Sequence, residues 1–405
     1  MENQTKSRKS PALKWFKPAT FLRYPAQYMI FFCILTIFLP YYVTSVAVSA
    51  VGLLFCLLPC TRNKIFSQRS SFLMLGFCML TGVVALSCQN YIGLMRTGVF
   101  AAMMVVAVVA RAVNTAHLFE RMMDLLCFCG SISAIGAVVE RIYHRNIAFY
   151  RCKALFVNPN FYGAAAMLVA LICIYKLLSG VGKPLFYFIC LAFNGIGIYL
   201  CGSMSLWVIL FFGITVMLLL NHEYRLLVTF LAALFVLLVS VILFPHIIPR
   251  LNELSTTTAN RVLIWEFAIE QIKKAPFLGH GFFSYRYLYY ANIGQFPEIY
   301  KASLAHNILL DSILCHGIIG TVILGAYGVI YARQLLDCRD ALCRVGASYQ
   351  VFTFITAAAA CIAVYGMIDT TMIWVQTGLI LLLIFSGIGV HERQIRHWLR
   401  KGEQY

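Results

Sequence analysis

The chain has 405 residues, of which 61% are hydrophobic and only 12% are charged, and its formal net charge is +17. A soluble domain carries about 25% charged residues, so the composition excludes an ordinary soluble protein and indicates a polytopic helical membrane protein. The basic excess lies mostly in tails and short loops, as in membrane proteins with positive cytoplasmic loops. No basic stripe with interleaved aromatic residues indicates a nucleic-acid partner.

Residues 1–25 form a basic stretch that we predict to be a cytoplasmic tail, and about twelve apolar segments of membrane-spanning length follow it. This count places both termini, including a second tail at 391–405, on the cytoplasmic side of one integral membrane domain, 1–405. The first two segments are short and are separated only around Pro40, so they could form one re-entrant hairpin. The segments fall at 27–41, 43–60, 72–89, 91–111, 121–141, 161–179, 184–201, 203–221, 226–246, 306–332, 350–371 and 373–390.

One loop breaks the charge rule. Between the fifth and sixth segments, on the predicted outer side, the sequence places a basic cluster directly before Asn158-Pro159-Asn160; it comprises Arg141, His144, Arg145, Arg151 and Lys153. Either the span count is wrong or the cluster attracts lipid head groups, because the charge bias is statistical. The functional alternative is an anionic ligand such as a pyrophosphate.

The longest polar connection, residues 247–305, is predicted to be an extracytoplasmic loop that carries part of an active site. Threonines at 256–258 offer N-caps for an amphipathic helix over Ala259–Lys274, which Pro276 and Gly279 would end. One face of that helix carries Arg261, Trp265, Ala268 and Ile272, and we expect it to pack on the membrane bundle.

Arg261 would then lie in the first turn of this helix, where free N–H groups already favour anions. A cation there is unfavourable unless an anion lies between it and the helix end, and a phosphate would satisfy both. A salt bridge to Glu253 is the structural alternative.

His306 lies where the chain re-enters the membrane. Imidazole titrates near neutral pH and is the commonest general base, although a histidine at this depth can equally be an interfacial, hydrogen-bonded residue. Asp311 lies five positions later, about 140° around the helix, so it does not orient His306 from within the same helix. Asp369 is an intramembrane carboxylate, functional by default, or an exposed cap.

Aromatic residues fill the segment between these two positions and form either an interfacial belt or a stacking platform for sugars; they are Phe277, Phe282, Phe283, Tyr285, Tyr287, Tyr289, Tyr290, Phe296 and Tyr300. No histidine set has zinc-like spacing, and no phosphate-cradling glycine loop or Asp-x-Asp pair is present. We therefore predict chemistry without a metal or cofactor.

Taken together, these residues resemble the O-antigen ligase/polymerase family of multispanning bacterial glycan transferases. The resemblance covers roughly residues 155–330 by motif, and its order and spacing are more specific than any single piece. Its motifs are Asn158-Pro159-Asn160, Arg261-x-x-x-Trp265 with Pro276 and Gly279-x-Gly281, and His306-Asn307-x-x-Leu310 with Gly317-x-x-Gly320.

The resemblance implies an all-α, GT-C-like membrane transferase that takes an undecaprenyl-pyrophosphate-linked glycan at the outer face of the bacterial cytoplasmic (inner) membrane. By the family pattern, Arg261 binds the donor pyrophosphate and His306 activates the acceptor hydroxyl. The chain departs from this pattern at Ser203-Met204-Ser205-Leu206, which lacks an arginine, and at Cys315, where an acidic residue is common. The outer basic cluster could supply the missing charge.

The sequence therefore predicts an inverting glycan transferase in which His306 and Arg261 are catalytic, with a glycan, lipid or protein acceptor. We assign substrate binding to Arg141, Arg145, Arg151, Lys153, Asn158, Asn160, Trp265 and Asn307. Ligase and polymerase share these motifs and differ in the acceptor. A polysaccharide or lipid-linked oligosaccharide transporter or flippase is the alternative from another class, and an inactive scaffold is a third.

Overall fold

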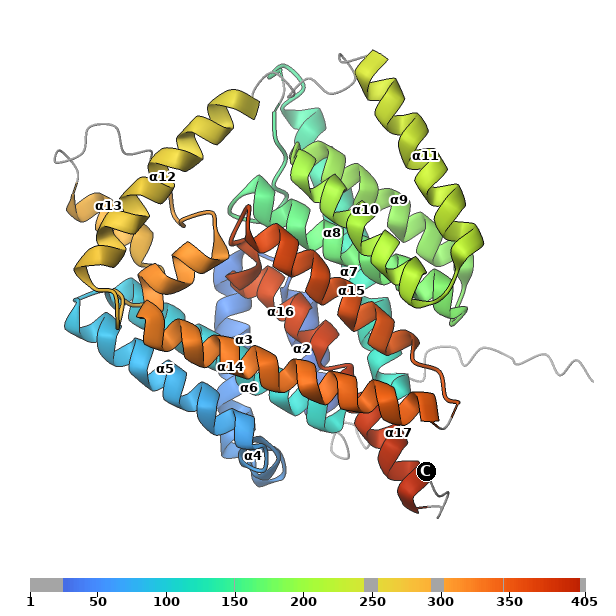
Figure 1. The fold of residues 1–405 in the computed structure, drawn as a ribbon, viewed down its shortest axis with the longest axis horizontal. Helices are drawn as coiled ribbons and strands as arrows, with labels where there is room; N and C mark the ends of the chain where they lie inside the picture. The colour runs from blue at the N-terminus through green and yellow to red at the C-terminus, as the bar shows by residue number, and fades with distance from the viewer. Residues whose placement is uncertain (1–24, 149, 244–253, 293–301, 345, 401–405) are drawn as a thin grey trace, which may run out of the picture.

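A computed structural model describes residues 25–148, 150–243, 254–292, 302–344 and 346–400. Across these ranges the chain is helical and contains no β-strand (Figure 1). The helices are α2 Pro25–Thr36, α3 Tyr41–Leu57, α4 Pro59–Phe66, α5 Arg69–Ser87, α6 Tyr91–Val113, α7 Ala116–Tyr143, α8 Pro159–Ser179, α9 Pro184–Cys201, α10 Met204–Leu220, α11 Tyr224–Leu243, α12 Leu254–Lys274, α13 Ser284–Ala291, α14 Ile308–Arg344, α15 Gln350–Gly366, the 3₁₀ turn η3 Thr371–Ile373, α16 Val375–Phe385 and α17 Ile388–Arg400.

Every predicted apolar segment corresponds to a helix, so the all-helical membrane fold is confirmed. In the described part of the chain, eight helices are long and apolar enough to cross a membrane, or nine if α3 and α4, bent by 90°, form one span. Three shorter apolar helices, α2, α10 and α15, accompany them. The count of twelve spans, the membrane orientation and the tails at 1–25 and 391–405 remain predictions, and most of the first tail lies outside the described residues.

Helix α8 is the centre of the bundle. Nearly all its residues from Phe161 to Lys176 are buried, and it packs against α7, α9, α10, α15 and α16. Small residues permit this close packing, as is usual between helices in a bilayer: a Cβ at Gly163 would lie 2.4 Å from the Cys201 Sγ. By contrast, α11 has no buried residue although it is the most hydrophobic span, so lipid must cover it.

The long helix α14 is broken at Gly317, whose φ of 63° and ψ of −176° are not helical. The break frees two carbonyls and two N–H groups that an intact helix would pair with each other. The segment 276–281 satisfies all four: the N–H groups of His280 and Gly281 donate to Leu314 and Cys315 at 3.0 and 2.8 Å, and those of Ile318 and Ile319 donate to Pro276 and Phe277 at 2.8 and 3.2 Å.

Glycine is required on both sides of this junction. A Cβ at Gly317 would lie 2.2 Å from the Phe277 carbonyl carbon, and one at Gly279, where φ is +70°, would lie 2.5 Å from the Gly317 nitrogen. The two glycine motifs in the sequence thus fasten the end of the α12 segment to α14. This attachment fixes the outer segment beside the start of α14, where His306 lies.

Candidate functional site

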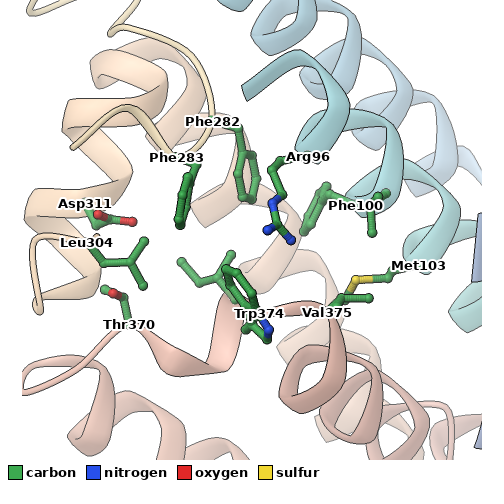
Figure 2. A pocket seen from close by; sticks show the side chains of 12 residues that line it. Arg96, Phe100, Met103, Phe282, Phe283, Leu304, Asp311, Thr370, Trp374 and Val375 are labelled. Atoms are coloured by element: carbon green, nitrogen blue, oxygen red, sulfur yellow. The ribbon is translucent and has the colours of Figure 1, made fainter. Parts of the chain in front are cut away.

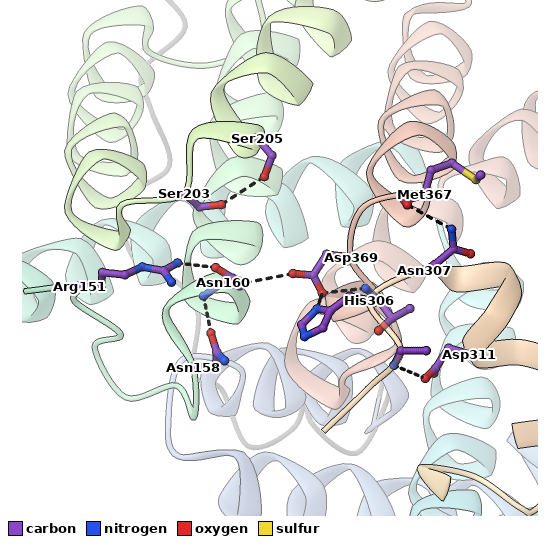
Figure 3. Close-up of polar contacts among 12 residues, drawn as sticks. Arg151, Asn158, Asn160, Ser203, Ser205, His306, Asn307, Asp311, Met367 and Asp369 are labelled. Atoms are coloured by element: carbon purple, nitrogen blue, oxygen red, sulfur yellow. Dashed lines mark hydrogen bonds and ion pairs between the residues drawn. The ribbon is translucent and has the colours of Figure 1, made fainter. Parts of the chain in front are cut away.

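His306 forms a pair with Asp369 across 63 residues of sequence (Figure 3). Its Nδ1 lies 3.1 Å from an Asp369 carboxylate oxygen. The His306 side chain is 25% exposed whereas that of Asp369 is 2% exposed, so the carboxylate is sealed and the imidazole remains accessible. His306 adopts a φ of +50°, a left-handed conformation that is unusual for a residue with a side chain and is found at functional sites.

The buried Asp369 carboxylate is held by further hydrogen bonds. The Asn160 amide donates to its second oxygen at 3.0 Å, and the Thr370 N–H donates to the first at 2.8 Å. Arg151 donates to the Asn160 carbonyl oxygen at 2.5 Å and to the Cys201 carbonyl at 2.9 Å. A chain of polar contacts therefore runs from Arg151 through Asn160 and Asp369 to His306 (Figure 3).

Asp369 decides the protonation of His306. Burial lowers the pKa of the imidazole, but the hydrogen bond to Asp369 and its negative charge outweigh burial, and the pKa is raised above 6.5. In the neutral ring, a proton on Nδ1 facing the carboxylate leaves the Nε2 lone pair free to accept a proton. The arrangement is that of an oriented general base.

The residues around His306 position its loop. Asp311 is buried and accepts from the Ala305 N–H at 2.9 Å, so it fixes the backbone next to His306 without contacting the imidazole. Asn307 accepts from the N–H groups of Leu309 and Leu310 at 3.0 and 3.1 Å and donates to the Met367 carbonyl at 3.2 Å. Asn307 thereby caps α14 and ties it to the turn that carries Asp369.

The prediction for the start of the amphipathic helix was wrong. Helix α12 begins at Leu254, so the threonines at 256–258 lie within it and do not cap it. Threonine is only slightly unfavourable inside a helix, by roughly 0.5 kcal/mol, so the preference for a cap is easily overridden. Arg261 then lies beyond the first turn, and the helix-terminus argument for an anion no longer applies to it.

Arg261 nevertheless lies near His306. Its positive charge lowers the pKa of His306, opposing Asp369. Its side chain is half-buried and makes no ion pair or hydrogen bond with any described residue; the alternative partner, Glu253, lies outside the described residues. Trp265, one turn further on, packs partly buried in the small core of α12 and α13, and its buried indole N–H has no hydrogen-bond partner among the described residues.

The cations of the outer basic cluster have different surroundings in the structure. The Arg151 side chain reaches the turn after α9, beside Gly202. This turn directly precedes Ser203-Met204-Ser205-Leu206, where the resemblance led us to expect an arginine that the chain lacks. Arg141 donates to the His144 and Ile147 carbonyls at 3.2 and 3.0 Å, at the end of α7. The Arg145 and Lys153 side chains are exposed.

Asn158 has a local role in the structure. Its side chain caps α8 by accepting from the Asn160 N–H at 2.8 Å. The cap aligns the first turn of α8 so that the Asn160 side chain can reach both Arg151 and Asp369.

The aromatic residues of the outer segment do not behave as one group. Tyr285 and Phe283 are buried, whereas Phe277, Tyr287 and Tyr290 are 65%, 38% and 47% exposed. Phe296 and Tyr300 lie outside the described residues. A sugar platform could therefore be built from only some of these rings.

A small apolar cavity lies beneath the His306 loop and contains a single arginine (Figure 2). The Arg96 guanidinium lies over the rings of Trp374, Tyr41 and Phe283 at 4.2, 5.1 and 5.4 Å. Within the described ranges its buried Nε has no hydrogen-bond partner, and no carboxylate pairs with it. Asp311 lines the same cavity, which adjoins the His306 loop.

Sequence reasoning left Asp369 and Arg96 out of the predicted site. Both are charged residues in strongly apolar segments, and an intramembrane charge is a functional signal in its own right. This signal was noted for Asp369, but the choice between a functional carboxylate and an exposed cap needed the structure. The burial of Asp369 and its contact with His306 decide against the exposed cap.

The described residues contain no group of three or more His, Cys, Asp or Glu side chains placed to hold a metal. A helical bundle with membrane-length helices and a pair formed by an accessible histidine and a buried carboxylate defines a polytopic membrane protein with an enzyme-like site. Residues 186–325 match the family model described as O-antigen ligase. This match, over about a third of the chain, supports an assignment to the O-antigen ligase/polymerase family and glycan transfer as the type of activity. No curated protein matched the chain.

The matched region runs from α9 into α14 and includes Arg261, Trp265 and His306. It does not include Arg151, Asn160 or Asp369. The three residues that complete the polar chain are therefore supplied by parts of this protein outside the matched region.

Proposed function

We propose that the protein transfers a glycan from undecaprenyl pyrophosphate to an acceptor hydroxyl at the outer face of the bacterial cytoplasmic membrane, without a metal and with inversion at the anomeric carbon. The observation that carries this proposal is the accessible His306 imidazole, oriented by buried Asp369, with the charge of Arg261 acting on it. A base and a cation that acts on it, and that pairs with no described carboxylate, suit a reaction in which a hydroxyl loses a proton and a diphosphate leaves.

In the proposed step, His306 Nε2 accepts the proton of the acceptor hydroxyl as the oxygen attacks the anomeric carbon. The bond from that carbon to the diphosphate oxygen breaks, and the diphosphate leaves with the electron pair. Arg261 stabilises the negative charge that develops on it, and Asp369 stabilises the imidazolium. A preorganised cation in a poorly hydrated site supplies the larger share of such catalysis, while a general base contributes about 10²–10⁴-fold.

The other residues predicted to bind substrate are assigned different roles. Arg151 and Asn160 position Asp369, and Arg151 brings positive charge to the turn after α9. Arg145 and Lys153 are available at the surface for the donor's sugars or diphosphate, and Arg141 stabilises their loop. Asn158 and Asn307 act by capping α8 and α14, and Trp265 can contact a glycan only through its partly buried ring, because its indole N–H is buried.

The alternative, a transporter or flippase, requires a polar site near the middle of the bilayer. The polar chain of His306, Asp369, Asn160 and Arg151 instead gathers where α8 and α14 begin. This placement favours chemistry on a lipid-borne head group at one membrane face.

The test is product analysis with purified protein in proteoliposomes that contain a lipid-diphosphate-linked glycan and candidate acceptors. An enzyme forms a covalent glycan–acceptor product, releases one undecaprenyl diphosphate for each transfer, and gives the opposite anomeric configuration by NMR. A transporter moves the intact lipid-linked glycan and forms no product. A product that keeps the donor's anomeric configuration would refute the single-displacement mechanism. Transfer to a different kind of acceptor would identify a ligase, and transfer to another repeat unit of the same glycan would identify a polymerase.

A further inference from the structure

A large cavity lined by described residues lies at the opposite end of the bundle from His306. It has a volume of about 1070 Å³ and is enclosed by α4, the start of α5, the end of α6, α14 near Gln334, and α17. Helix α6 begins beside the His306 site, because the Asn90 side chain donates to the Phe282 carbonyl at 3.1 Å. Arg111, which lines the cavity, follows 21 residues later, about 31 Å along the helix at 1.5 Å per residue, which matches the thickness of a bilayer core.

The lining of this cavity carries an excess of positive charge. Four lysine and arginine side chains face it together with one carboxylate, that of Glu392. Arg111 neutralises this carboxylate at 2.5 Å and also donates to Gln334 at 3.0 Å. The remaining cations are Lys64, Arg393 and Arg396, and none of them pairs with a carboxylate of the described residues.

Two of these cations, Arg393 and Arg396, lie close together on α17 and form no ion pair with a described carboxylate. Arg393 donates to the Ala112 carbonyl at 2.6 Å, and only the charge of Glu392, which Arg111 already pairs, acts favourably on it among the described residues. The charge of Arg396, one turn along α17, acts unfavourably on it. Neighbouring like charges repel each other, and an anion bound between them relieves that repulsion.

The N-terminus of α5 adds a further positive end to the same cavity. This helix of 19 residues begins after Gln68 with no side-chain cap and no acidic residue in its first turn. Ser67, Gln68 and Ser70 around that end all line the cavity. Free backbone N–H groups at a helix N-terminus bind phosphate, and hydroxyl and amide groups next to them can donate to the remaining oxygens.

We propose that this cavity binds the phosphate group of an anionic ligand, between the start of α5 and the cations of α17. Phosphate matches three features at once: unpaired arginines, an uncapped helix N-terminus and neighbouring hydroxyl donors. The group could belong to an anionic phospholipid of the adjacent leaflet, because basic pockets between membrane helices bind such head groups, or to a soluble phosphate compound. The proposal is independent of the glycan-transfer reaction at the other face.

The test uses the full-length protein in neutral detergent and measures ligand binding by native mass spectrometry and by the shift in Tm. One arm adds phosphatidylglycerol with phosphatidylcholine as its neutral comparison, and the other adds inorganic pyrophosphate. The variant is Arg393→Gln/Arg396→Gln, and the matched control is Arg339→Gln/Arg344→Gln, which removes the same charge from exposed positions near the end of α14. Arg396→Gln alone serves if the double variant unfolds, because Arg396 forms no hydrogen bond with the described residues.

We expect the wild type to bind phosphatidylglycerol or pyrophosphate at least tenfold more tightly than the cavity variant, and the control variant to bind as the wild type does. Binding in the first arm alone identifies a lipid head group, and binding in the second identifies a soluble phosphate; both support the site. Equal loss in the cavity and control variants would show attraction to net charge only and overturn the proposal. No preference for phosphatidylglycerol over phosphatidylcholine, with no pyrophosphate binding, would also overturn it.

Discussion

Replacing Asp369 by asparagine keeps the size of the side chain and removes the charge that raises the pKa of His306. The contact that is lost is a charge-assisted hydrogen bond, 3.1 Å long, on a carboxylate that is 2% exposed. Such a bond contributes about 1.5–3 kcal/mol. Since about 1.4 kcal/mol corresponds to a tenfold change in rate, Asp369→Asn should slow glycan transfer by about 10- to 150-fold if the bond is maintained in the transition state.

The pH dependence gives a second and independent signature. In the wild type the pKa of His306 is raised above 6.5, so its basic, neutral form accumulates as the pH rises through that value, and transfer should increase over the same interval. Without the Asp369 charge, burial and the charge of Arg261 both lower the pKa of His306. The acid limb of the pH–rate profile should therefore move to lower pH while the maximal rate falls.

The assay is the initial rate of transfer in proteoliposomes between pH 5 and 9, with radiolabelled donor and saturating acceptor. Asp340→Asn is the matched control, because Asp340 is 61% exposed and pairs only weakly with its neighbour Arg339 at 3.4 Å. It should behave as the wild type. An unchanged acid limb in Asp369→Asn, with an unchanged rate, would refute the idea that this carboxylate orients and tunes His306.

Three further predictions concern the cations and the junction. Arg261→Ala should lower kcat/KM for the donor by about 10- to 150-fold, the equivalent of one charge-assisted phosphate contact. Arg261→Lys should recover part of this loss, because it restores the charge without the guanidinium fork. Equal loss in both variants would indicate a packing role. Arg151→Ala and Asn160→Ala act through one polar chain, so the double variant should be no slower than the slower single variant, and additive effects would contradict the chain. Gly317→Ala should destabilise the protein by about 3 kcal/mol or more, because of its left-handed φ and a clash with backbone, whereas Gly325→Ala, with open space around it, should leave Tm unchanged.

Much of the fold was predictable because hydropathy is a local property. A run of apolar residues of spanning length must form a helix in a bilayer, since no water is present to pair its backbone, and each such run is helical in the structure. The boundary of α12 was not predictable in the same way. Threonine costs only about 0.5 kcal/mol inside a helix, so a threonine run does not determine where the helix starts, and the helix extends past these residues to Leu254.

The site was predictable only in part, because its contacts join distant segments. His306 and Arg261 were chosen for their chemistry and position, and the structure places them near each other. Asp369 contacts His306 across 63 residues and Asn160 across 209. No periodicity or spacing rule relates residues at such separations. The substrate contacts predicted for Asn158 and Asn307 remain predictions; in the structure their side chains cap helices, a role that Asn commonly has directly before a helix.

The most direct test of the account is the rate of glycan transfer by His306→Ala, measured together with donor binding on the same membrane preparation. The imidazole supplies the base and Arg261 supplies the diphosphate contact, so the variant should insert in the membrane and retain the lipid-diphosphate donor while transfer falls by at least about 10²-fold. Transfer at the wild-type rate by a correctly folded His306→Ala protein would contradict the account.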